Sequence, residues 1–211
     1  MRNINIKNAF VNELKSIAFF DFDGTITTRD TFPEIIKFQK DKRSFYMGFI
    51  LNAPLLVGYK LGIIPNDIAK QKILKYCLAG MDEDTFQRNC DAFADKKLSH
   101  LIRPEALMEI RKLKKDGTEV VIVSASAGNW IRKWSDSYGL ELISTSLEIK
   151  NGLITGRIEG RNCHGEEKVR RIRERWNLDD IDEVYAYGDS EGDNPMLALA
   201  TKSFYRPFRG I

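Results

Sequence analysis

Polar side chains with catalytic potential stand at the ends of three apolar runs in this sequence. Asp21, Ser124 and Asp189 each close such a run, and Asp23 and Asp193 follow within a few residues. If the runs are strands of one parallel sheet, these side chains gather at its carboxyl edge, where ligands bind in open α/β sheets. Two carboxylates about 4 Å apart repel by roughly 4 kcal/mol at an effective dielectric near 20. A hard divalent cation relieves that repulsion, so the pattern predicts a Mg²⁺ site suited to phosphate chemistry.

Hydrophobic periodicity predicts the elements that must bring these residues together. The predicted strands are 16–22, 118–126, 140–146, 183–190 and 202–208, with a separate hairpin over 147–160 that turns at Asn151–Gly152. The predicted helices include 65–80, 103–117, 128–138, 165–177 and 194–200. Strands that alternate with helices predict an α/β fold, here a doubly wound, mainly parallel Rossmann-like sheet.

The segment 31–100 interrupts this alternation because helical patterns dominate it. We expect it to form an inserted α-helical cap domain. The core domain would then comprise residues 1–30 and 101–211.

Composition describes an ordinary globular protein, with 43% apolar and 30% charged residues. The formal net charge of +3 is too small to indicate a nucleic-acid partner, and we expect none. The three cysteines have no CxxC spacing, which argues against zinc and against a disulfide framework. The first residues contain no apolar stretch typical of a secretion signal, so we expect a cytoplasmic protein.

The motifs taken together resemble those of the haloacid dehalogenase superfamily of phosphohydrolases, in its phosphoserine-phosphatase-like branch. The matching pieces are DFDGT at 21–25, VSAS at 123–126, Lys168 within GEEKV, and GDSEGD at 188–193. They occur in the family's order, so the resemblance covers essentially the whole chain. It implies the superfamily's Rossmann-like core with an inserted cap, and a Mg²⁺-dependent phosphomonoester hydrolase.

The resemblance also implies a role for each matching residue. Asp21 corresponds to the nucleophile that becomes an aspartyl-phosphate, and Asp23 to the general acid/base. The phosphate-binding positions are Gly24, Thr25, Ser124, Ala125 and Lys168. The metal positions are Asp21, Asp189, Asp193 and Asp23, the last through its backbone carbonyl.

Two substrate classes remain open, a small phosphomonoester such as phosphoserine and a lipid phosphate such as phosphatidylglycerophosphate. Phosphoserine phosphatases carry a cap glutamate that contacts the serine amino group, and Asp30 is its nearest counterpart here. They also tend to carry paired glycines where this chain has Ala125 and Ser126. The apolar segment 45–64 resembles the phosphatidylglycerophosphatase branch, and we interpret it first as buried cap core. A peripheral contact with the inner membrane face is the alternative, whereas Lys60 opposes a membrane span.

A different class of function also uses acids, a hydroxyl residue and a lysine at strand ends. This alternative is a non-hydrolytic phospho-acceptor module that resembles a receiver domain, and Asp23 and the helical insertion both argue against it. The expected partner is therefore a phosphorylated small molecule or lipid, bound by a monomer or homodimer. We expect a structural or surface role for His164, and packing for Trp130.

Overall fold

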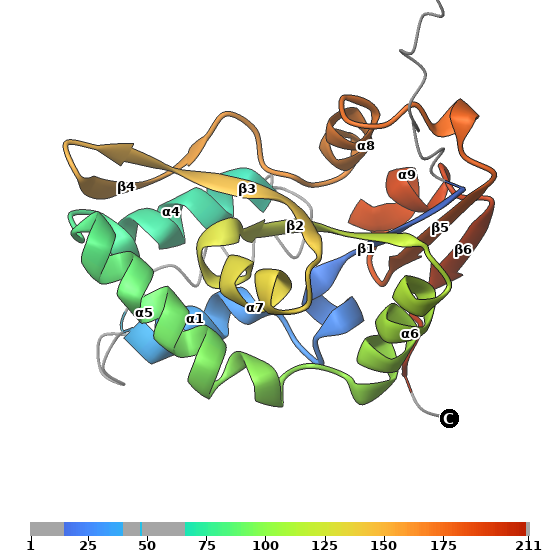
Figure 1. Ribbon diagram of the computed structural model, residues 1–211. Helices are drawn as coiled ribbons and strands as arrows, with labels where there is room; N and C mark the ends of the chain where they lie inside the picture. Colours follow the sequence, from blue (N-terminus) through green and yellow to red (C-terminus); the bar gives the residue numbers. More distant parts are fainter. Residues whose placement is uncertain (1–14, 40–46, 48–65, 210–211) are drawn as a thin grey trace, which may run out of the picture.

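A six-stranded sheet forms the centre of the computed structural model, which describes the chain except for residues 1–14, 40–46, 48–65 and 210–211 (Figure 1). The strands are β1 (Ser16–Phe20), β2 (Glu119–Ala127), β3 (Glu141–Lys150), β4 (Leu153–Glu159), β5 (Glu183–Gly188) and β6 (Lys202–Tyr205). Their order is β4-β3-β2-β1-β5-β6, and each neighbouring pair is parallel except β3 with β4. The predicted doubly wound, mainly parallel α/β sheet is therefore confirmed.

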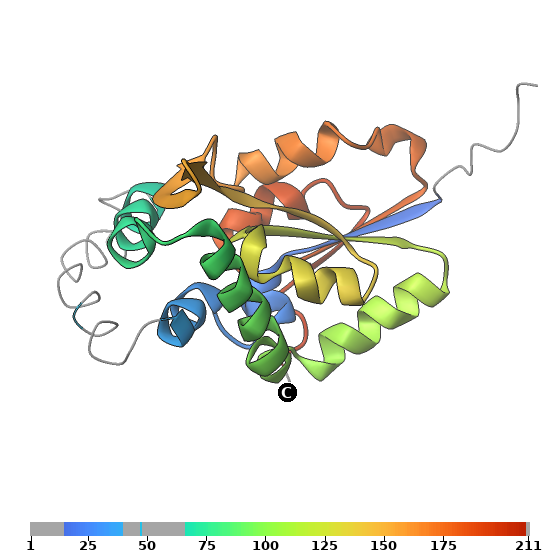
Figure 2. The ribbon, with the colours of Figure 1, turned by 60° about the vertical axis from the view of Figure 1, so that its left-hand side comes forward.

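Helices cover both faces of this sheet, as the turned view shows (Figure 2). They are α1 (Thr31–Gln39), α4 (Asn66–Leu78), α5 (Glu83–Lys96), α6 (Pro104–Lys115), α7 (Arg132–Ser137), α8 (Glu166–Arg173) and α9 (Asn194–Leu197). Short segments lie between the strands and helices. The loop η1 (Phe22–Ile26) has a non-helical backbone at Asp23 and Gly24, and the others are single 3₁₀ turns: η2 (Leu98–His100), η3 (Gly128–Trp130), η4 (Leu178–Asp180) and η5 (Glu191–Asp193).

Strand β1 shows why this sequence forms a central strand. Its residues after Ser16 are fully buried, and they alternate between two separate apolar clusters. Phe19 belongs to the cluster that contains Ile172 of α8, whereas Phe20 belongs to the cluster that contains Ile110 of α6. A parallel strand with helices on both faces needs apolar residues at every position, because neither side meets water.

The hairpin differs from its prediction in one respect. The expected strand 140–146 and the first arm of the hairpin form one continuous strand, β3. Its first half pairs parallel with β2 as far as the Ala127–Thr145 pair, and its second half pairs antiparallel with β4 from Ser146 onward. The strand continues because β4 supplies the hydrogen-bonding partner where β2 ends.

The described helices of the insertion, α1, α4 and α5, pack against the rest of the protein rather than standing apart from it. Helix α4 lies along β4, and the backbone of Lys75 approaches Gly156 so closely that a side-chain carbon there would lie 2.3 Å from the Lys75 Cα atom. Whether 31–100 is a separate cap domain stays a prediction.

The apolar segment 45–64 lies outside the described residues, apart from Met47. Within the part of the chain that the structure describes, no helix combines the length and apolar character that a membrane crossing requires.

Candidate active site

The strand order reverses beside β1, since β2 and β3 lie on one side of it and β5 and β6 on the other. Asp21 follows β1 and Asp189 follows β5, so the two acids stand at the switch point where open α/β sheets bind ligands. A cleft of about 840 Å³ opens there. The acids that line it include Asp21, Asp23, Asp30, Asp189 and Asp193, together with the cations Lys70 and Lys168.

Asp21 and Lys168 form a buried ion pair at the base of this site. The Lys168 Nζ donates to Asp21 Oδ1 and to Asp193 Oδ1, each at 2.7 Å, and the lysine side chain is 1% exposed. Burial raises the pKa of Asp21 to about 7, although the positive charge of Lys168 opposes that rise. Burial also disfavours the charged lysine, but the two carboxylates hold the pKa of Lys168 above its usual value. The site thus keeps a buried positive charge beside Asp21.

Asp23 lies in a different environment, held at both carboxylate oxygens. Its Oδ1 accepts hydrogen bonds from the backbone N–H and the hydroxyl of Thr31, at 2.7 and 2.6 Å. Its Oδ2 accepts one from the Ser126 hydroxyl at 2.5 Å. Two neighbouring carboxylates with such different partners can take different chemical roles.

Three carboxylates converge where a metal would bind. Oxygen atoms of Asp21, Asp189 and Asp193 all lie within 4.8 Å of one another. Gly24 permits this approach, because a side-chain carbon at its position would lie 2.5 Å from Asp189 Oδ2, and its φ of +83° lies in the region that glycine favours. An all-oxygen set of this kind suits Mg²⁺.

Asp193 differs from the other two acids because its pKa is lowered, whereas burial raises those of Asp21 and Asp189. Asp193 Oδ1 accepts from Lys168, and Asp193 Oδ2 accepts from the backbone N–H and the hydroxyl of Ser190. Burial opposes its ionisation, but Lys168 and these donors hold the pKa of Asp193 below its ordinary value. Its carboxylate therefore suits a supporting position at the edge of the metal site.

Four of the five residues expected to bind phosphate fall into two groups, and the fifth, Gly24, lies against Asp189 as described above. Ala125 and Lys168 line the cleft. Thr25 and Ser124 are fully buried, and each contacts a residue of the site: the Thr25 hydroxyl donates to Asp21 Oδ2 at 3.1 Å, and Ser124 Oγ accepts from the Ser126 N–H.

Asp30 also lines the cleft, and it accepts a hydrogen bond from the Phe32 N–H at the start of α1. Burial, together with the nearby charge of Asp23, raises the pKa of Asp30 to about 6. The candidate cap acid is therefore placed where it could contact a substrate.

Sequence reasoning missed several residues that line the cleft. Lys70 of α4 donates to the backbone carbonyl of Ala125, and burial lowers its pKa. His164 and Arg206 also line the cleft, although His164 was expected to have a structural or surface role. No motif marks Lys70, because it is one of several lysines on a helix with no distinguishing spacing.

Comparisons with known proteins identify the family of this chain. The family of haloacid dehalogenase-like hydrolases matches residues 18–198. The chain belongs to this family. It is 34% identical over 195 residues to the protein CicA of Caulobacter vibrioides, covering 90% of this chain and 86% of that protein. The resemblance inferred from the motifs is therefore confirmed, and the chain is a hydrolase by family.

Solved structures share the fold. A protein of unknown function from Bordetella pertussis superposes with a TM-score of 0.77 at 24% identity, covering 90% of this chain and 88% of that one. A phosphoserine phosphatase, solved as an analogue of its phospho-aspartyl intermediate, superposes with a TM-score of 0.61 at 23% identity, covering 90% and 85% of the two chains.

Proposed function

We propose that this protein is a Mg²⁺-dependent phosphomonoester hydrolase that forms an aspartyl-phosphate on Asp21. The observation that carries the proposal is the buried Asp21–Lys168 pair beside Asp189, with Asp23 held separately in the same cleft. In the proposed mechanism Asp21 attacks phosphorus and Asp23 moves the proton. Family membership among hydrolases supports the proposal.

In the first step, an Asp21 oxygen attacks phosphorus while the bond from phosphorus to the ester oxygen breaks. Asp23 gives its proton to the departing alkoxide, which leaves as an alcohol. In the second step, Asp23 takes a proton from water as that water attacks phosphorus, and the bond to Asp21 breaks to release inorganic phosphate. Asp21 and Asp189 would hold Mg²⁺ with the Asp23 carbonyl, while Asp193 supports them. The ion supplies positive charge that offsets the charge of the phosphoryl group.

We propose a small phosphomonoester as substrate, in preference to a lipid phosphate. The part of the cleft beyond the phosphate site contains Asp30 and Lys70, and both side chains suit a polar leaving group. A solved phosphoserine phosphatase shares this fold, which supports the same choice. Phosphatidylglycerophosphate remains the competing substrate, because segment 45–64 lies outside the described residues.

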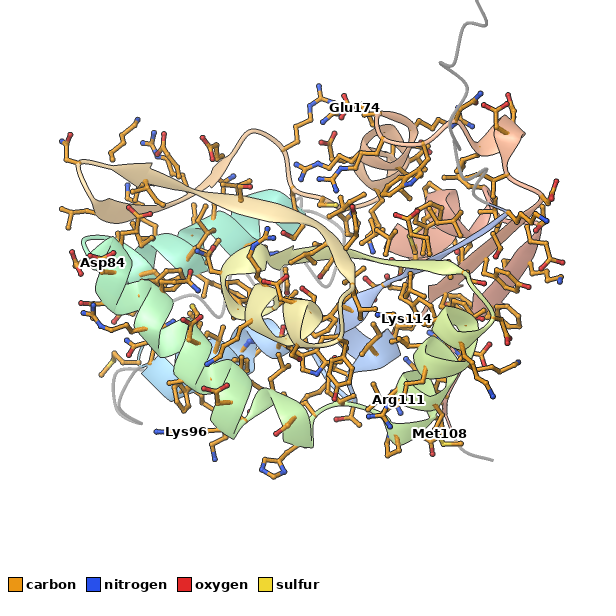
Figure 3. All side chains as sticks on the ribbon, in the orientation of Figure 1. Asp84, Lys96, Met108, Arg111, Lys114 and Glu174 are labelled. Atoms are coloured by element: carbon orange, nitrogen blue, oxygen red, sulfur yellow. The ribbon has the colours of Figure 1, made fainter. Side chains whose placement is uncertain are left out.

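The test is phosphate release from phosphoserine, other soluble phosphomonoesters and phosphatidylglycerophosphate in micelles, with Mg²⁺ and with a chelator. We expect Mg²⁺-dependent release from a soluble ester and no turnover by Asp21→Asn. The matched control is Asp84→Asn, since Asp84 is an exposed acid on α5 that should not affect activity (Figure 3). Full activity of Asp21→Asn would refute the mechanism, and a strong preference for the lipid would refute the substrate.

The lifetime of phosphate on Asp21 separates the hydrolase from a phospho-acceptor module. We expect label from a phosphate donor to turn over with each catalytic cycle. Label that persists while no phosphate is released would instead indicate a receiver-like module, whose Asp23 does not activate water.

A further inference from the structure

Ser126 contacts the candidate general acid/base directly, although no motif role covers it. Its hydroxyl donates to Asp23 Oδ2, and the residue is 2% exposed. We propose that Ser126 is a positioning residue that holds Asp23 for proton transfer, an inference that rests on the proposed function.

The hydrogen-bond donors around Asp23 distinguish its oxygen Oδ1 from its oxygen Oδ2. The Trp130 indole N–H, which can only donate, donates to Thr31 Oγ1 at 3.0 Å. The Thr31 hydroxyl is therefore left to donate its own proton to Asp23 Oδ1, which also accepts the Thr31 backbone N–H. With two donors directed at Oδ1 and, among the described residues, only the Ser126 hydroxyl directed at Oδ2, Oδ2 is the oxygen more open to exchange a proton with a substrate.

A serine hydroxyl suits this position because it both donates and accepts. The hydroxyl can donate to Oδ2 and, by turning, accept from it, so the contact need not break when a proton moves onto or off that oxygen. A backbone N–H or a lysine in the same place could only donate. Ser126 can therefore hold the side chain through both half-reactions.

Ser126 and Thr31 hold Asp23 from different parts of the fold. Thr31 is the first residue of α1, which begins the inserted segment 31–100, whereas Ser126 lies in β2 within the central sheet. Any movement of the insertion would carry the Thr31 donors with it. The contact with Ser126 fixes Asp23 Oδ2 relative to the sheet, and therefore relative to Asp21, which follows the neighbouring strand β1.

The test compares two esters on the same enzyme sample. p-Nitrophenyl phosphate has a leaving group that needs little protonation, whereas the alkyl ester phosphoserine needs a proton from Asp23. We expect Ser126→Ala to lower kcat/KM for the alkyl ester by about 10- to 100-fold, which is part of the usual contribution of a general acid. The same variant should change kcat/KM for the aryl ester by less than about 3-fold. Ser126→Thr, which keeps the hydroxyl, should restore most of the alkyl activity.

The ratio of the two kcat/KM values is independent of how much of a variant is folded, because both esters are measured on one sample. The matched control is Ser135→Ala, which removes a buried serine hydroxyl of α7 that bonds only to the Arg132 carbonyl among the described contacts and should leave the ratio unchanged. An equal fall for both esters, or no change for either, in Ser126→Ala would overturn the positioning role. If the wild type hydrolyses neither ester, or Asp21→Asn stays active, the proposed function fails and this role fails with it.

Discussion

Replacing Lys168 with methionine would remove the cation that lies between Asp21 and Asp193 while keeping most of the side-chain volume. Both carboxylates would then face each other in a buried site without their shared partner. We expect the variant to be less stable in the absence of Mg²⁺, and to recover part of that loss when Mg²⁺ is added. The ion would replace the lysine as the positive charge between the two acids.

The size of the loss follows from the geometry. Asp21 Oδ1 and Asp193 Oδ1 each lie 2.7 Å from the same nitrogen atom, so they are no more than twice that distance apart. Two unit charges at such a separation repel by about 3 kcal/mol at an effective dielectric near 20, and protonation of Asp21, whose pKa burial already raises to about 7, would relieve part of this repulsion. Removal of one partner from a buried ion pair typically costs about 3–5 kcal/mol, which agrees with this value.

Urea unfolding of the wild type and of Lys168→Met, with a chelator and with Mg²⁺, measures the effect. The matched control is Lys96→Met, since Lys96 projects from the end of α5 into solvent (Figure 3) and should change the free energy of unfolding by less than about 0.5 kcal/mol. A Lys168→Met variant as stable as this control would refute the reasoning, because the buried acids would then not depend on the lysine.

Two further predictions concern stability away from the site. Hydrogen bonds from Arg170, together with those from Arg171, lower the pKa of Glu167 from 4.5 to about 2 against an opposing effect of burial. Because the pKa of Glu167 is lower in the folded protein, ionised Glu167 contributes to the free energy of unfolding above about pH 4.5. That contribution is lost as the pH falls toward 2. Glu167→Gln should therefore cost about 1 kcal/mol near neutral pH, after allowance for solvent screening, and a urea-measured difference that stays constant down to pH 2 would contradict this. Gly156→Ala should lower stability by about 2–4 kcal/mol, since its Cβ would overlap the α4 backbone at a φ of +76°. Gly160→Ala, at a similar φ of +69° with open space around it, should cost only about 1 kcal/mol, and equal thermal shifts for the two variants would exclude the packing explanation.

The prediction of the strands succeeded because local composition decides them. Every residue of β1 after Ser16 is apolar, and that pattern fits a strand covered by helices on both faces. The continuity of β3 could not be predicted in the same way. Its second half continues because β4 replaces β2 as its partner at Ser146, and strand pairing is a property of two segments.

The acids at the ends of β1 and β5 were also visible in advance, since the carboxyl ends of parallel strands share one edge. The sequence predicted only some of the cations that lie beside these acids. Lys168 was singled out by its place between two motifs, whereas Lys70 reaches the Ala125 carbonyl from a helix 55 residues earlier in the chain.

By itself, the sequence determined which residues stand at the strand ends and, through them, the family and the class of chemistry. The tertiary structure alone decided what those residues contact. Asp23 and Ser126 are 103 residues apart and meet because β1 and β2 are neighbours in one register. Hydrogen bonds of this kind depend on strand order and register, and β1 and β2, which are buried on both faces, show no alternation that would specify either of them.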